Sequence, residues 1–206
     1  MIQKNNNNQA FTLIEMVVAI AIFTIFISMI SGTYLYVARA QRDSAEMRKV
    51  YSGARDVVSD ISQDVKLQSV YYGCYEGSAM GISECLTTVD LTQGNEVDHL
   101  ALYSGDEAEV FYAEDGVVYV NEYVFDGASW LPASGYEDGA KAVTAAPLTV
   151  DGLYFRIFPA YDPDEYYDDV SLQFQPHITV YIDSSYSDIL NFSLQTSVST
   201  RTYVQN

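Results

Sequence analysis

The feature that most constrains the fold of this chain is a long apolar stretch close to its N-terminus. From 16 to 30 every residue is apolar except Thr24 and Ser28, and shorter apolar segments flank this run on both sides. A stretch of this length is sufficient for a helix that spans a membrane. Its one ionisable residue is Glu15, near the start. Because a carboxylate within a span is costly, Glu15 is a candidate functional residue.

A short motif, Ala10-Phe11-Thr12-Leu13-Ile14-Glu15, opens this stretch and follows a polar leader, residues 1–10. The leader, the motif and the apolar run together resemble the class III signal of type IV prepilins and type II secretion pseudopilins. The resemblance implies that prepilin peptidase cuts between Ala10 and Phe11 and that the new amino group of Phe11 is methylated. It also implies that Glu15 pairs with the N-terminal amine of a neighbouring subunit in a fibre. The family usually has glycine where this chain has Ala10.

Two other interpretations of the N-terminus are a cleaved secretory signal and a plain membrane anchor. A secretory signal has a basic start and a small-residue cleavage site after its apolar core, and this chain matches both poorly. A plain anchor has no need of Glu15. The lysines and arginines beside the span, taken alone, favour an N-terminus outside the cytoplasm. The resemblance implies the opposite, a cytoplasmic leader and an exported C-terminal body.

The helix is expected to continue beyond the span, which we place at 11–38. No proline occurs over 39–69, and apolar residues recur there in steps of three and four, the spacing of an amphipathic helix. A single helix over 11–67 would be roughly 85 Å long. The alternative is two helices with a break at Ser31-Gly32-Thr33. The residues predicted to form the apolar face over 39–70 are Met47, Val50, Ala54, Val57 or Val58, Ile61 and Val65.

The remainder of the chain, 71–206, is strongly acidic. It carries 22 acidic residues against three basic ones, in a protein whose net charge is −18. Nucleic-acid binding through the phosphates requires basic clusters, so this class of partner is excluded. The sequence contains no metalloprotease, nucleophile-elbow, phosphate-loop or dinucleotide motif, and we therefore predict neither an enzyme nor a bound cofactor.

The two cysteines, Cys74 and Cys85, lie 11 positions apart in the glycine-rich segment 71–96, which is predicted to be a loop. In an exported chain this spacing favours an intrachain disulfide. A redox or metal role is disfavoured because there is no C-x-x-C motif and no histidine nearby. His99 lies in a predicted strand and His177 directly precedes one, and neither has an acid or nucleophile partner in the sequence. Each is expected to be either satisfied or exposed.

The acidic run 162–169 offers oxygen ligands that could suit Ca²⁺, with Asp162, Asp164 and Asp168 as the candidates. The run lacks the spacing of an EF-hand loop. The interpretation that we favour is a solvated acidic loop.

Beyond residue 97, short apolar runs alternate with turn residues, which predicts an α+β fold. An antiparallel sheet of one or two layers would cover the apolar face of the helix, and the resemblance implies a pilin-like head. Glu114-Asp115-Gly116 predicts a hairpin turn, and Asp126-Gly127 and Asp151-Gly152 predict further turns. The expected strands are His99–Tyr103, Glu109–Tyr112, Val117–Val120, Tyr123–Phe125, Leu153–Phe158, Ile178–Ile182 and Phe192–Ser199.

Two C-terminal stretches, Phe174–Val180 and Asn191–Arg201, look like the ends of J-type pseudopilins and PilW-type minor pilins. The expected function is therefore a structural subunit of a type II secretion pseudopilus or a type IV pilus, including pili for adhesion or DNA uptake. Its partners would be other subunits, prepilin peptidase and the inner membrane. The alternative is a membrane-anchored ligand-binding or sensory domain, in which the bond between Ala10 and Phe11 stays uncut.

Overall fold

The computed structural model describes residues 12–75, 82, 85, 96–144, 148–163, 175–186 and 190–200. By its internal contacts the chain divides into two units, one that ends at Met47 and one that begins at Arg48. The helix α1, Leu13–Leu67, contributes residues to both units. It passes through Ser31-Gly32-Thr33 without interruption, so the prediction of one helix is confirmed and the two-helix alternative is wrong.

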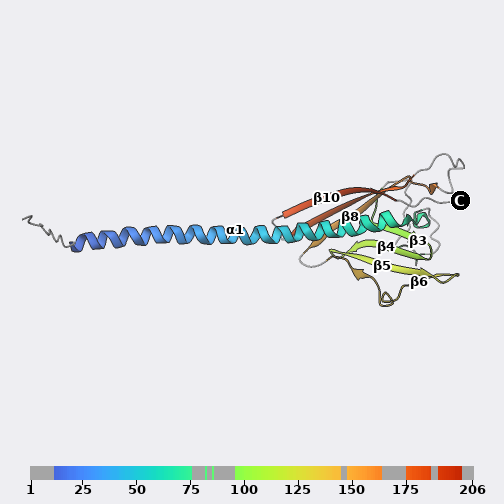
Figure 1. The fold of residues 1–206 in the computed structure, drawn as a ribbon, viewed down its shortest axis with the longest axis horizontal. Coiled ribbons are helices and arrows are strands. Elements are labelled where there is room, and N and C mark those ends of the chain that lie inside the picture. The colour runs from blue at the N-terminus through green and yellow to red at the C-terminus, as the bar shows by residue number, and fades with distance from the viewer. Residues whose placement is uncertain are drawn as a thin grey trace, which may run out of the picture. The chain divides into compact units, whose positions relative to one another are not determined.

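The described strands all pair antiparallel, as predicted, and form two sheets (Figure 1). One sheet has the order β1-β3-β4-β5-β6, with β7 also paired to β5, and the other has the order β10-β9-β8-β2. A short 3₁₀ helix, η1 (Tyr72–Cys74), follows the first strand. The strands are β1 (Ser69–Val70), β2 (Glu96–Val97), β3 (His99–Ser104), β4 (Glu107–Glu114), β5 (Val117–Phe125), β6 (Trp130–Pro132), β7 (Lys141–Ala142), β8 (Thr149–Phe158), β9 (His177–Tyr186) and β10 (Leu190–Ser199).

Within the second unit, the part of α1 from Arg48 onward lies between the two sheets (Figure 1), and its apolar face is part of the core. Burying one large apolar side chain is worth about 1.5–3 kcal/mol, so this face holds the helix to the sheets. Met47 and Val58, also expected on the face, are only half-buried. The predicted face is otherwise confirmed, since the buried helix residues are Val50, Ala54, Val57, Ile61 and Val65.

The strand β5 is longer than the sequence pattern predicts. The pattern indicates two strands, at Val117–Val120 and Tyr123–Phe125, and the structure has one. The polar residues between them, Asn121 and Glu122, stay in the ladder because each pairs with a residue of β4. Pairing with β4 therefore keeps these two residues in strand conformation, although their polar side chains would locally favour a break.

The hairpin turn predicted between β4 and β5 is confirmed. Asp115 has a φ of 49° and Gly116 a φ of 81°. Both residues lie in the left-handed region, as a two-residue hairpin turn of the primed type requires. Asp126-Gly127 likewise follows the end of β5 in a turn, where Asp126 Oδ1 accepts hydrogen bonds from the backbone amides of Ala128 and Ser129.

The turn predicted at Asp151-Gly152 is wrong, because both residues lie inside β8. The pairing with β9 shifts there, with Val150 opposite Ser184 and Gly152 opposite Asp183. Asp151 is thus the extra residue of a bulge. The bulge changes the phase of the strand, so that Val150 and Leu153 are both buried although they are three residues apart.

Candidate functional site

The helix α1 begins with a reciprocal pair of contacts between Thr12 and Glu15. Glu15 Oε2 accepts hydrogen bonds from the backbone amide of Thr12, at 2.9 Å, and from its hydroxyl, at 3.0 Å. In return, the hydroxyl oxygen of Thr12 accepts from the backbone amide of Glu15 at 3.4 Å. This is a capping box, which satisfies backbone donors that the first turn of a helix leaves unpaired.

This cap adds a role for Glu15 that the family resemblance does not imply, although the spacing Thr12-x-x-Glu15 is its sequence signal. Only one of the two carboxylate oxygens is used, since Oε1 has no hydrogen-bond partner among the described residues. The cap is therefore compatible with a second contact to a cation. Ala10 and Phe11, the predicted cleavage and methylation residues, lie outside the described residues.

The first half of α1 is exposed on every side. None of the described residues from 12 to 45 is buried, although most of the side chains from 13 to 37 are apolar. This part of the helix is long and apolar enough to cross a membrane. The hydroxyls of Thr24 and Ser28 donate to the backbone carbonyls of Ile20 and Thr24, at 2.7 and 2.8 Å. Both polar side chains are thus satisfied within the helix, which suits an apolar surrounding.

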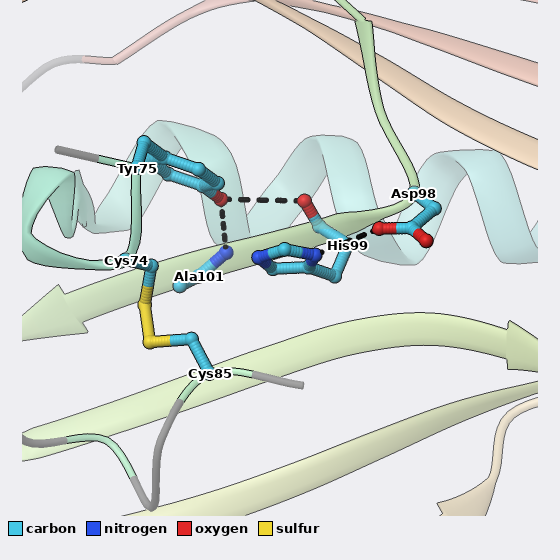
Figure 2. Close-up of a disulfide and its surroundings, with 6 residues drawn as sticks. All are labelled: Cys74, Tyr75, Cys85, Asp98, His99 and Ala101. Carbon is cyan, nitrogen blue, oxygen red and sulfur yellow. Dashed lines mark hydrogen bonds and ion pairs between the residues drawn. A yellow bond between two sulfur atoms is a disulfide. The ribbon is translucent and has the colours of Figure 1, made fainter. Parts of the chain in front are cut away.

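Cys74 and Cys85 form a disulfide in the structure, shown in Figure 2, with their Cα atoms 5.5 Å apart. Both cysteines are buried, and Cys74 is the last residue of η1. The disulfide therefore links the last residue of η1 to the residue 11 positions further along the chain.

Removing this disulfide is expected to lower the stability of the head without changing its fold. A Cys74→Ser variant should lose about 2–3 kcal/mol of the free energy of unfolding, because the unfolded chain is no longer restricted. Chemical denaturation with and without a reductant measures this. The reductant should destabilise the wild type and leave the variant unchanged, and an equal response of both proteins would contradict the prediction.

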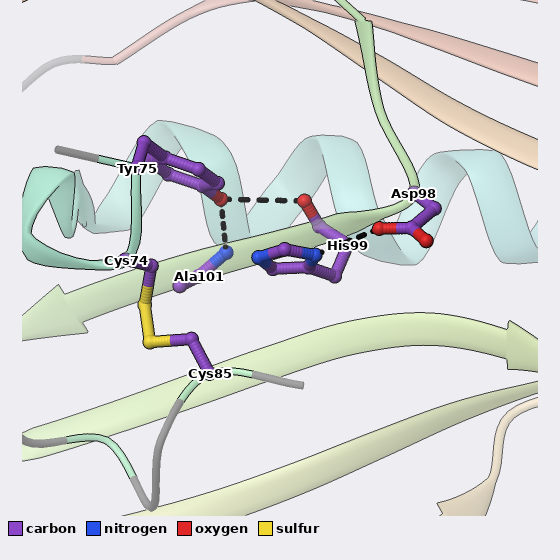
Figure 3. Close-up of polar contacts among 6 residues, drawn as sticks. All are labelled: Cys74, Tyr75, Cys85, Asp98, His99 and Ala101. Atoms are coloured by element: carbon purple, nitrogen blue, oxygen red, sulfur yellow. Dashed lines mark hydrogen bonds and ion pairs between the residues drawn. A yellow bond between two sulfur atoms is a disulfide. The ribbon is translucent and has the colours of Figure 1, made fainter. Parts of the chain in front are cut away.

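Next to the disulfide, the side chain of Tyr75 forms hydrogen bonds that connect the residues after η1 to β3 (Figure 3). Its hydroxyl donates to the backbone carbonyl of His99 at 3.3 Å and accepts from the backbone amide of Ala101 at 2.8 Å. Its ring stacks on the His99 ring, with 5.4 Å between the centroids. Burial raises the pKa of Tyr75, so that this phenol stays protonated and keeps its donor.

The two histidines differ in their surroundings. His99 is buried, and its Nδ1 lies 2.9 Å from Asp98 Oδ1, whereas its Nε2 has no hydrogen-bond partner among the described residues. The expectation of a satisfied or exposed side chain is therefore only half right for His99. His177 is exposed on β9, and its ring lies 5.0 Å from that of Phe158.

Three carboxylates interact electrostatically where α1 packs on the first sheet, an arrangement that the sequence analysis did not predict. Glu109 of β4 pairs directly with Glu122 of β5, and like charges opposite each other destabilise a sheet. Burial, then the negative charge of Asp64 on α1 and to a lesser extent that of Glu122, raises the pKa of Glu109 to about 7. Gln68 opposes this shift by a hydrogen bond to the Glu109 side chain. The hairpin of β4 and β5 sets Glu109 opposite Glu122. The packing of α1 on this sheet adds Asp64, and no local motif signals that approach.

Glu109 is expected to make the head less stable as the pH rises. Its pKa is raised above the ordinary 4.5 in the folded state, so the folded chain binds this proton more tightly than the unfolded chain does. The free energy of unfolding therefore falls as the pH rises from about 4.5 to above 7. Glu109→Gln should therefore stabilise the head by about 1 kcal/mol near pH 8, after allowance for solvent screening, and have little effect near pH 4.

Thermal unfolding across this pH range measures the effect. Glu114→Gln, an exposed change at the end of the same strand and not among the charges that act on Glu109, is the matched control. The prediction fails if both variants show the same pH dependence as the wild type.

Of the three candidate calcium ligands, Asp164 and Asp168 lie outside the described residues, and Asp162 is half-buried. The part of the chain that the structure describes holds no group of three or more residues that could bind a metal. The calcium prediction stays untested.

The comparison with known proteins bears on the N-terminus. Residues 5–31 match the family model described as the prokaryotic N-terminal methylation motif. This range contains the predicted cleavage position, the capping box and the apolar run from Met16 to Ile30. No curated protein and no solved structure matches the chain.

Proposed function

We propose that this chain is a structural minor subunit of a pseudopilus or pilus, within the type IV pilin and pseudopilin superfamily. The match of residues 5–31 to the N-terminal methylation motif supports the proposal. Prepilin peptidase removes residues 1–10, Phe11 is methylated, and the subunit then joins a fibre. A J-type pseudopilin or PilW-type minor pilin is the more specific form of this proposal.

One observation carries the proposal: a helix that is apolar and exposed on all sides begins with a carboxylate that retains an unused oxygen. An apolar surface of this extent requires lipid or other apolar helices around it. In either apolar setting, a cation near Glu15 interacts with it more strongly than in water. The methylated amine of a neighbouring Phe11 is such a cation, and the contact would fix the position of one subunit against the next.

The head extends the proposal to the location of the protein. The mature chain would be held in the inner membrane by α1, with the acidic head on the outer side, where a disulfide is stable. The subunit itself would perform no chemistry. Its partners would be the other subunits of the fibre.

The mass and N-terminal sequence of the protein extracted from membranes test the proposal. A chain that begins at Phe11 and carries one added methyl group supports it. A chain that begins at Met1 overturns it and favours a membrane-anchored ligand-binding or sensory domain. A host strain without prepilin peptidase is the control, because the same preparation should there yield the unprocessed chain.

A further inference from the structure

The edges of the two sheets are not protected equally. Open strand edges tend to pair with other chains, and proteins usually end their sheets with short strands to prevent this. Among the described elements, three of the four edges end in short strands: β1 and β2 have two residues each and cover only part of β3 and β8, and β5 is covered by β6 and β7, which have three and two. The fourth edge is β10, which has ten residues and, among the described strands, pairs only with β9.

The strand β10 also lacks the residues that usually block an edge. It contains no charged residue, no proline and no glycine. Its residues alternate between an exposed polar row, which includes Ser193 and Gln195, and a row directed to the core, which includes Phe192 and Leu194. Phe192 and Leu194 are only half-buried, so apolar area remains open at this edge.

The helix α1 lies beside this edge. The ring of Tyr51 on α1 is 5.8 Å from the ring of Phe192 on β10, and Tyr51 is 50 % exposed. A strand added beside β10 would be able to cover both rings. It would also bond the row of backbone groups that β10 does not share with β9.

The charged residues of α1 near Tyr51 are positive, whereas the rest of the head is acidic. Arg48 and Arg55 lie three residues before and four residues after Tyr51, so they share its side of the helix. Both are exposed and form no salt bridge with a described residue. Asp64, by contrast, lies on the side that faces Glu109 of β4. The helix thus presents these two arginines to the open edge and an acid to the other sheet.

We propose that the outer edge of β10, together with Arg48, Tyr51 and Arg55 of α1, binds an extended acidic segment of another protein chain as an added strand. Backbone hydrogen bonds would supply affinity for any extended segment. Apolar side chains at alternate positions of the segment would pack on Phe192 and Tyr51, and its carboxylates would pair with the two arginines. This binding surface is independent of the proposed function, because it uses only residues of the second unit.

The test uses the full chain in detergent and a fluorescent peptide of the length of β10, with valine at alternate positions, serine between them and glutamates at one end. A second peptide carries lysines in place of the glutamates. The glutamate peptide should bind about tenfold more tightly at low salt, and this difference should shrink at high salt. Binding should also slow the hydrogen exchange of backbone amides in β10.

Two variants of equal charge change make the test specific. Arg55→Glu should weaken the binding of the glutamate peptide by about tenfold or more. Lys49→Glu, on a different side of α1 from Tyr51, should leave it unchanged. Equal effects of the two variants, an absence of binding, or binding without slower exchange in β10 would each overturn the proposal. So would a stable dimer whose β10 amides are already protected without peptide, because the edge would then belong to a second copy.

Discussion

A subunit with Glu15→Gln is expected to insert into the membrane and to be cleaved normally, but to enter the fibre at least about tenfold less often than the wild type. Glutamine keeps the capping box, because either Glu or Gln can serve at this position of the box. It cannot neutralise the amine of a neighbouring subunit. An unpaired cation in an apolar surrounding costs several kcal/mol, which is well above the 1.4 kcal/mol that corresponds to about a tenfold change.

Immunoblots of sheared fibres, normalised to the membrane pool, measure this loss. Thr12→Ala is the matched control, since it removes the hydroxyl contacts of the cap at a cost of about 1 kcal/mol and keeps the charge of Glu15. Incorporation of the Thr12→Ala variant should remain close to that of the wild type. If the Thr12→Ala variant is lost and the Glu15→Gln variant is retained, Glu15 acts as a helix cap and the pairing is wrong.

The second large effect is expected at the cleavage position. Ala10→Arg should leave the leader attached to nearly all of the protein, because a peptidase site that accepts glycine or alanine has little room for a long charged side chain. The intact mass of the membrane fraction should then correspond to the full 206 residues. Without a free amine on Phe11, the variant should also be absent from fibres.

Ala10→Gly provides the control for this position. It introduces the residue that the resembling family usually has there, and it should be processed at least as completely as the wild type. Processing of the Ala10→Arg variant to the normal mass would show that the cut lies elsewhere.

The helix can be predicted almost completely from the sequence. Its apolar run and its steps of three and four are local patterns, and the buried residues, among them Ala54 and Ile61, are those that the steps predict. The hairpin at Asp115-Gly116 is equally accessible, because the two left-handed residues form a local signal.

The elements that the sequence does not reveal depend on distant partners. β6 and β7 are strands only because the long strand β5 offers them an edge to pair with. The polar residues inside β5 stay extended for the same reason. The hairpin turn sets Glu109 opposite Glu122, whereas the approach of Asp64 from α1 follows from packing and not from spacing. The capping box at Thr12 is different, since its pattern is local but is easily overlooked beside the stronger signal of the apolar run.

The hydroxyls of Thr24 and Ser28 donate to backbone carbonyls of their own helix. The helix from Met16 to Ile30 therefore presents only apolar groups to its neighbours. Attraction between such surfaces is non-directional, and it favours no single rotation or axial position. In a fibre of the proposed kind, the polar contact at Glu15 would therefore supply the axial register that the apolar contacts do not. Tension that shifted one subunit against the next would have to break this contact, and the several kcal/mol lost by leaving a charge unpaired would oppose the shift.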